Sequence, residues 1–92
     1  LAHARLQEVV GLMRANMPRE VVLRALADYY HTVINGHLFA RVNNSLLMGE
    51  INAILKKLGM NEVVHGNLDL IAIRMNYGEF RTYFGQFIQQ YQ

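Results

Sequence analysis

The sequence YGEFRTYFGQFIQQYQ, residues 77–92, places aromatic side chains on one face of a predicted helix. These aromatic residues recur at intervals of three and four, and they are Tyr77, Phe80, Phe84, Phe87 and Tyr91. Because residues three and four apart lie on the same side of a helix, the spacing predicts a single aromatic seam. The opposite face is polar, so we expect an amphipathic helix that must bury this seam.

The start of this helix carries its own signal. Asn76 can cap the first turn, and Glu79 three residues later completes the pattern of a capping box. Gly78 and Gly85 each cost about 1 kcal/mol relative to alanine, whereas burying one aromatic side chain returns roughly 1.5–3 kcal/mol. An isolated helix of this length is marginal in water. The seam is therefore expected to dock on the preceding helices or on another chain, and the sequence leaves both possibilities open.

Three segments before it also show helical periodicity. We predict helices over residues 2–15, over residues 17–34, and from the Asn43-Asn44-Ser45 break to residue 58. Asn16 is expected to cap the second helix ahead of Pro18. Asn35-Gly36 and Gly59 are expected to end the second and third helices, because these residue types accept a left-handed conformation.

Two segments are ambiguous. Residues 37–42, HLFARV, suit either a helical turn or a short strand. Over residues 61–75, Asn67 as a cap and Asp69 in a first turn favour a helix, while Val63-Val64 and the alternation that follows leave a β-hairpin open. The predicted fold is all-α, a compact bundle of four to five short helices, and the alternative is an α+β fold with a small hairpin at 62–75.

Length and composition bound the class of protein. The 92 residues predict one helical domain over 1–92, and because the chain does not begin with Met it could be a piece of a longer protein. Apolar residues make up 52% of the chain, more than a small core needs, so some apolar surface is expected to be spare. There is no cysteine, no apolar run long enough to span a membrane, and a net charge of only +2. We expect a cytoplasmic protein without a membrane partner.

Few residues could carry chemistry. Asp28-x-x-His31 and Glu62-x-x-His65 resemble half of a di-metal ligand set, but such pairs arise easily by chance, and His65 precedes a Gly-Asn break. The chain has one serine, two threonines and no phosphate-binding loop. We therefore predict no enzyme activity, no catalytic residue, no metal and no cofactor.

A basic surface supports a second hypothesis. The cations around the first helical corner and at the end of the third helix could contact nucleic-acid phosphates, and they are Arg14, Arg19, Arg24, Lys56 and Lys57. Tyr30 falls on an apolar face, so Tyr29 is the ring expected to be free for base stacking.

The function favoured by the sequence is a protein–protein interaction or oligomerisation module of a regulatory or adaptor protein. Its predicted partner interface is the aromatic seam, with the five methionines as adaptable neighbours. The partner would be another protein or a second copy of the chain. The alternative is a small nucleic-acid-binding regulator that uses the Arg14/Arg19/Arg24 surface.

Overall fold

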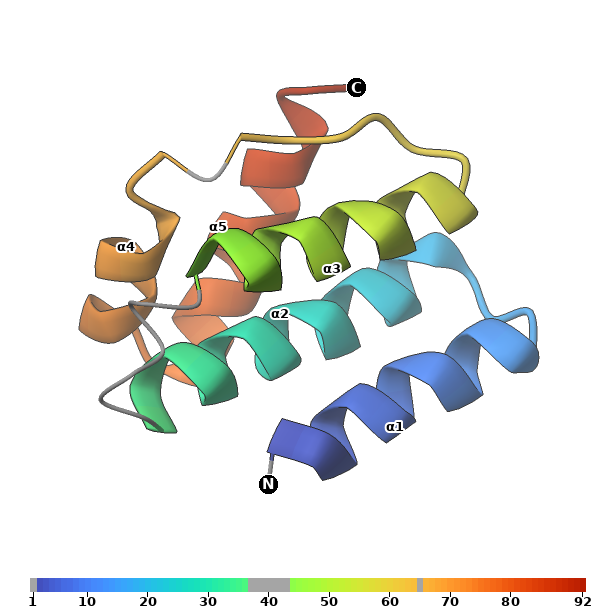
Figure 1. Ribbon diagram of the computed structural model, residues 1–92, viewed down its shortest axis with the longest axis horizontal. Helices are drawn as coiled ribbons and strands as arrows, with labels where there is room; N and C mark the ends of the chain where they lie inside the picture. The colour runs from blue at the N-terminus through green and yellow to red at the C-terminus, as the bar shows by residue number, and fades with distance from the viewer. Residues whose placement is uncertain (1, 37–43, 65) are drawn as a thin grey trace.

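Within the part of the chain that the structure describes, the protein folds into five α-helices in a compact arrangement (Figure 1). The computed structural model describes residues 2–36, 44–64 and 66–92. The helices are α1 (Ala2–Arg14), α2 (Arg19–Gly36), α3 (Asn44–Lys57), α4 (Leu68–Arg74) and α5 (Tyr77–Gln89). The predicted all-α bundle is confirmed. Residues 37–42, where helix and strand were both open, lie outside the described residues.

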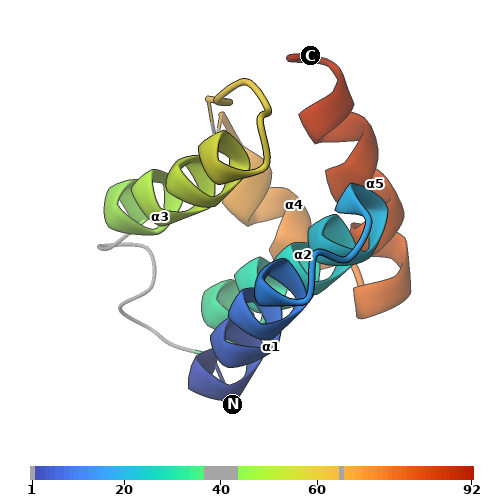
Figure 2. The same ribbon diagram turned by 90° about the vertical axis from the view of Figure 1, so that its right-hand side faces the viewer.

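Helix α2 lies at the centre of the bundle. Helices α1, α4 and α5 make their closest backbone approaches to it, and α5 crosses it steeply (Figures 1 and 2). Every residue from 25 to 32 is buried, so the middle of α2 is covered on all sides. The sequence predicted that Tyr30 is on an apolar face and that Tyr29 is free, but both are buried because helices pack on α2 from several directions.

Two helix ends adopt the same C-terminal motif. After α3, Gly59 has a φ of 75°, its N–H donates to the Lys56 carbonyl, and the N–H of Met60 donates back to the Leu55 carbonyl. After α1, Asn16 has a φ of 56° and makes the equivalent bond to Met13. Gly59 therefore ends α3 as predicted. Asn16 does not cap α2 as expected, because it closes α1 instead.

The segment 62–75 contains a helix and no hairpin among its described residues. Val63 lies outside the helices, and its backbone pairs with a side chain. The Val63 N–H donates to Asn52 Oδ1 at 2.8 Å, and Asn52 Nδ2 donates to the Val63 carbonyl at 2.9 Å. A side-chain amide of α3 thus takes the hydrogen bonds that a second strand would have made. Asn67 precedes α4 as predicted, although its side chain makes no capping bond.

The capping box of α5 is present. Asn76 Oδ1 accepts a hydrogen bond from the Glu79 N–H at 2.8 Å, and Glu79 accepts one from the Asn76 N–H at 3.1 Å. The helix therefore begins where the sequence predicted. This start sets which of its aromatic side chains face α2.

Candidate functional site

The centre of the aromatic seam lies inside the chain. Phe80 and Phe84 are fully buried, and both rings stack on Tyr30 of α2 with centroids 5.8 and 6.4 Å apart. Ile88 continues this buried stripe one turn later. Phe80 and Phe84 are therefore core residues of the single chain, and a partner could reach them only if α5 left α2.

The outer members of the seam already have contacts within the chain. The Tyr77 ring lies 4.5 Å from the His31 ring, and its hydroxyl shares a 2.6 Å hydrogen bond with Thr32 Oγ1. At the other end, Phe87 packs against Tyr91, and the Tyr91 hydroxyl donates to the Val64 carbonyl at 3.4 Å. The five aromatic residues thus do not gather on one open face.

A buried carboxylate connects three helices near the start of α5. Asp28 is 5% exposed, and Arg81 donates to its two oxygens through Nε and Nη2, both at 2.8 Å. Arg5 Nη1 lies 3.8 Å from the same carboxylate. The guanidinium carbon of Arg5 lies 5.1 Å from the centre of the Tyr77 ring. The hydrogen bonds that Arg81 donates to Asp28, together with the charge of that carboxylate, raise the pKa of Arg81 above its usual value. The carboxylate is occupied by cations and serves to hold α1, α2 and α5 together.

His31, the other half of the Asp-x-x-His pair, does not join this carboxylate in a ligand set. Its Nε2 lies 2.6 Å from the Met75 carbonyl oxygen and so carries the proton that it donates. Its Nδ1 is buried and has no hydrogen-bond partner within the described residues. No group of three or more His, Asp or Glu side chains in residues 2–36, 44–64 and 66–92 is placed to hold a metal ion. His65 of the second pair lies outside the described residues.

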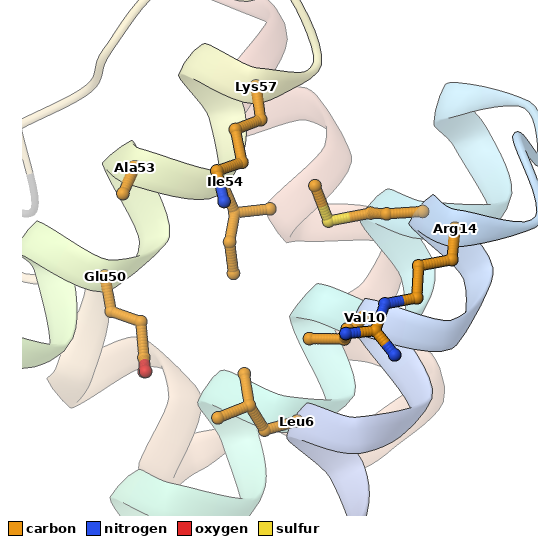
Figure 3. A pocket seen from close by; sticks show the side chains of 8 residues that line it. Leu6, Val10, Arg14, Glu50, Ala53, Ile54 and Lys57 are labelled. Carbon is orange, nitrogen blue, oxygen red and sulfur yellow. The ribbon is translucent and has the colours of Figure 1, made fainter.

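An open groove lies between α1 and α3 (Figure 3). We call this hollow of about 500 Å³ the α1–α3 groove, and its lining residues are Leu6, Val10, Met13, Arg14, Glu50, Ala53, Ile54 and Lys57. Apolar side chains of the two helices face each other across it. Arg14 and Lys57 stand near one end, where both helices finish, and Glu50 stands toward the other. The groove is thus an apolar trough with opposite charges along its length.

Glu50 of the groove is held in place by Tyr29 of α2. The Tyr29 hydroxyl donates a hydrogen bond to Glu50 Oε1, and Tyr29 itself is buried. Burial, together with the hydrogen bond and the charge of Glu50, raises the pKa of Tyr29 above its ordinary value. The expectation that Tyr29 is free for base stacking is wrong, because the residue is buried and Glu50 of α3 engages its hydroxyl.

Four of the five predicted cations belong to one end of the molecule. Figure 1 shows that the last turns of α1 and α3 and the first turn of α2 lie at the same end, and these turns carry Arg14, Lys56, Lys57 and Arg19. Arg24 is separate: it lines a hollow between α2 and α5 together with Glu20 and Arg81. Only Arg14 and Lys57 of the five line the α1–α3 groove.

Comparisons with models of protein families, with curated proteins and with solved structures found no match. The candidate site therefore rests on the geometry above. None of the helices described is both long and apolar enough to cross a membrane.

Sequence reasoning missed the α1–α3 groove. A signal was present in α1, where Val9 and Val10 are adjacent apolar residues and so cannot both face the same neighbour. Val9 is fully buried, whereas Val10 is exposed at the groove. The apolar stripe of α1 is wider than its contact with α2 requires, and the excess forms one wall of the groove.

Proposed function

We propose that this chain is a protein-interaction module whose α1–α3 groove receives an apolar helix of a binding partner. The observation that carries the proposal is the open trough of about 500 Å³ with apolar walls and charged ends. Insertion of the apolar face of an amphipathic helix into such a groove is a common mode of recognition. The proposal keeps the interaction role expected from the sequence and moves its surface away from α5, because Phe80 and Phe84 are buried within the chain.

The walls of the groove are supported by the core. Ile54 is buried, and Leu6 and Met13 pack against the core cluster. Ala53 contributes only a methyl group, which leaves room for a side chain of the partner. A trough that exists before binding avoids part of the entropic cost of ordering an interface. These features favour a preformed docking surface over one that assembles on contact.

The test uses labelled helical peptides that share one composition. One peptide carries leucines at positions 1, 4 and 8 with glutamates at its N-terminal end, and a second has the same residues in scrambled order. Fluorescence anisotropy should show the first peptide binding in the micromolar range and the second binding at least tenfold more weakly.

Variants locate the binding on the protein. Val10→Lys should abolish binding of the first peptide, because it puts a charge on the apolar wall. Val64→Lys is the matched control, since Val64 is also an exposed valine but does not line the groove. Equal affinity of both peptides, or a Val10→Lys variant that binds like the wild type, would refute the proposal.

Nucleic-acid binding is a second candidate, favoured by the four cations that belong to one end of the molecule. Phosphate contacts release counterions, so binding should weaken steeply with salt. Arg19→Gln should weaken binding to a labelled duplex at 50 mM salt and flatten its salt dependence. Arg24→Gln, on a different surface, should leave it unchanged. Absence of binding by the wild type at 50 mM salt would remove this candidate.

A further inference from the structure

The outer face of α4 is an exposed apolar ridge. Leu70 and Ile73, one turn apart, are 52% and 50% exposed. The inner face of the same helix is packed against the core through Leu68 and Ala72, both fully buried. Asn35 of α2 also donates a hydrogen bond to the Ala72 carbonyl at 3.1 Å. The helix is therefore anchored on its inner face, while Leu70 and Ile73 on its outer face remain about half exposed.

Charged residues flank the ridge in a definite order. Asp69 precedes Leu70 and Arg74 follows Ile73. Arg74 is exposed on the outer face of α4 beside Leu70 and Ile73, whereas Asp69 is half-buried at the edge of that face. Asp69 and Arg74 are separated along the axis by about 7.5 Å, at 1.5 Å per residue. We call these four residues, Asp69, Leu70, Ile73 and Arg74, the α4 ridge.

The charged residues of the α1–α3 groove lie in the complementary order along α3. Glu50 stands toward one end and Lys57 near the other, about 10.5 Å apart along α3 by the same rise per residue. A helix that lies antiparallel to α3 would place an acidic residue near Arg14 and Lys57 and a basic residue near Glu50. The α4 ridge has this polarity and a similar length.

We propose that the occupant of the groove is a second copy of this chain, whose α4 ridge lies in the α1–α3 groove antiparallel to α3. This inference rests on the proposed function, since it names the partner of the same groove. The contact joins two different surfaces, so each copy keeps one free groove or one free ridge, and association continues head to tail. With only two apolar side chains inserted, the affinity is weak, with a dissociation constant on the order of 100 μM.

Sedimentation equilibrium of the full chain between 10 μM and 2 mM tests the inference. The wild type should be monomeric at the lowest concentration and should form dimers and larger species as the concentration rises. A ridge variant, Leu70→Gln/Ile73→Gln, and a groove variant, Val10→Gln/Ala53→Gln, should each stay monomeric. All four positions are exposed, so far-UV circular dichroism should show both variants folded. Val64→Gln, which alters an exposed valine outside both surfaces, should associate like the wild type.

Mixing the two variants is the decisive measurement. The ridge variant keeps an intact groove and the groove variant keeps an intact ridge, so an equimolar mixture should form a dimer and no larger species. A mixture that stays monomeric, or a wild type that is monomeric at 2 mM, would overturn the inference.

Charge exchange tests the antiparallel orientation. Lys57→Asp, which reverses a charge in the groove, should weaken association several-fold. Mixing this variant with a chain that carries Asp69→Lys in its α4 ridge should recover most of the lost affinity. No recovery in the paired mixture would contradict the antiparallel arrangement.

Failure of this inference can be told apart from failure of the proposed function. The monomeric ridge variant has a free groove and should still bind the acidic helical peptide described above. If it does so while the wild type never self-associates, the groove accepts helices but not this chain's α4. If it does not bind the peptide, the proposed function fails.

Discussion

At the scale of single residues, the most informative side chain is Asp28. Its position in an Asp-x-x-His pair suggested a metal ligand, but the structure pairs it with Arg81 from a helix more than 50 residues later in the chain. A buried carboxylate needs a compensating charge, because desolvation otherwise costs several kcal/mol. Asp28 therefore ties the position of α5 to that of α2.

Removing Arg81 should show how strongly the stability of the fold depends on its ion pair with Asp28. Arg81→Ala leaves Asp28 buried with only the more distant Arg5, so we expect the free energy of unfolding to fall by about 2 kcal/mol, less than for a fully buried pair because Arg81 is 44% exposed. Urea denaturation followed by circular dichroism measures this. Arg24→Ala, an exposed arginine without such a partner in the hydrogen bonds described, should change stability by less than about 0.5 kcal/mol. A similar cost for both variants would contradict the assignment.

Two buried tyrosines predict loss of stability at alkaline pH. Burial raises the pKa of Tyr29 and of Tyr30, assisted by Glu50 and by Asp69 respectively. In the unfolded chain both hydroxyls ionise near pH 10. Above that pH the unfolded state loses protons that the folded state retains, so the free energy of unfolding falls as pH rises, while below pH 10 the contribution is fully present.

Unfolding in urea between pH 8 and pH 11.5 measures this effect. Tyr29→Phe should reduce the steepness of the fall above pH 10, because one of the two groups is removed. Tyr83→Phe is the matched control, since it removes a tyrosine hydroxyl from a residue that is only partly buried. An identical slope in the wild type and Tyr29→Phe would contradict the assignment.

At the scale of helices, Gly59 and Gly85 differ in whether their backbone conformation requires glycine. Gly59 has a φ of 75° and closes α3, a conformation that residues with a side chain rarely adopt. Gly85 lies within α5, and no heavy atom of a neighbouring element lies within 4 Å of the position where a Cβ would stand. One glycine is required by its conformation, and the other weakens a helix without a packing reason inside the chain.

Alanine at each position should therefore change stability in opposite directions. Gly85→Ala should raise the free energy of unfolding by up to about 1 kcal/mol, the difference in helix propensity. Gly59→Ala should lower it by about 1 kcal/mol, because of the left-handed conformation. Thermal and urea denaturation measure both. If Gly85→Ala destabilised the protein, α5 would have to make a close contact that the isolated chain does not contain.

At the scale of the whole molecule, α2 and the aromatic stripe of α5 share one core. Phe84 contacts the Tyr30 ring, and the core cluster extends from Val9 in α1 to Ile88 in α5. Because the helices meet in this shared cluster, no helix is expected to unfold alone when its centre is damaged.

Phe84→Ala should cost about 3–5 kcal/mol, as for other buried aromatic side chains. We expect the far-UV helical signal and the near-UV aromatic signal to be lost in one coincident transition. Tyr91→Ala, at an exposed site, should cost far less and serves as the control. A Phe84→Ala protein that changed its solution mass while keeping its helices would instead place this residue between chains.

Much of the helical structure could be predicted from the sequence. The capping box at Asn76 and Glu79 and the stop at Gly59 both follow from residues within a few positions of one another. Hydrogen bonds in a helix and at its ends join near neighbours, so local sequence is sufficient to specify them. The same reasoning failed at Asn16, where two helix ends lie only a few residues apart and both could use the same cap.

The tertiary structure alone decided which faces meet. The spacing of the aromatic residues in α5 required a surface but did not identify it, and Tyr30 became that surface only when α2 and α5 crossed. The partner of Asp28 and the α1–α3 groove likewise depend on residues that are distant in sequence. The sequence determined the helices because the hydrogen bonds that form them join near neighbours. The site depends on long-range packing, because the free energy of folding that holds its residues together comes from apolar surface that the five helices bury jointly.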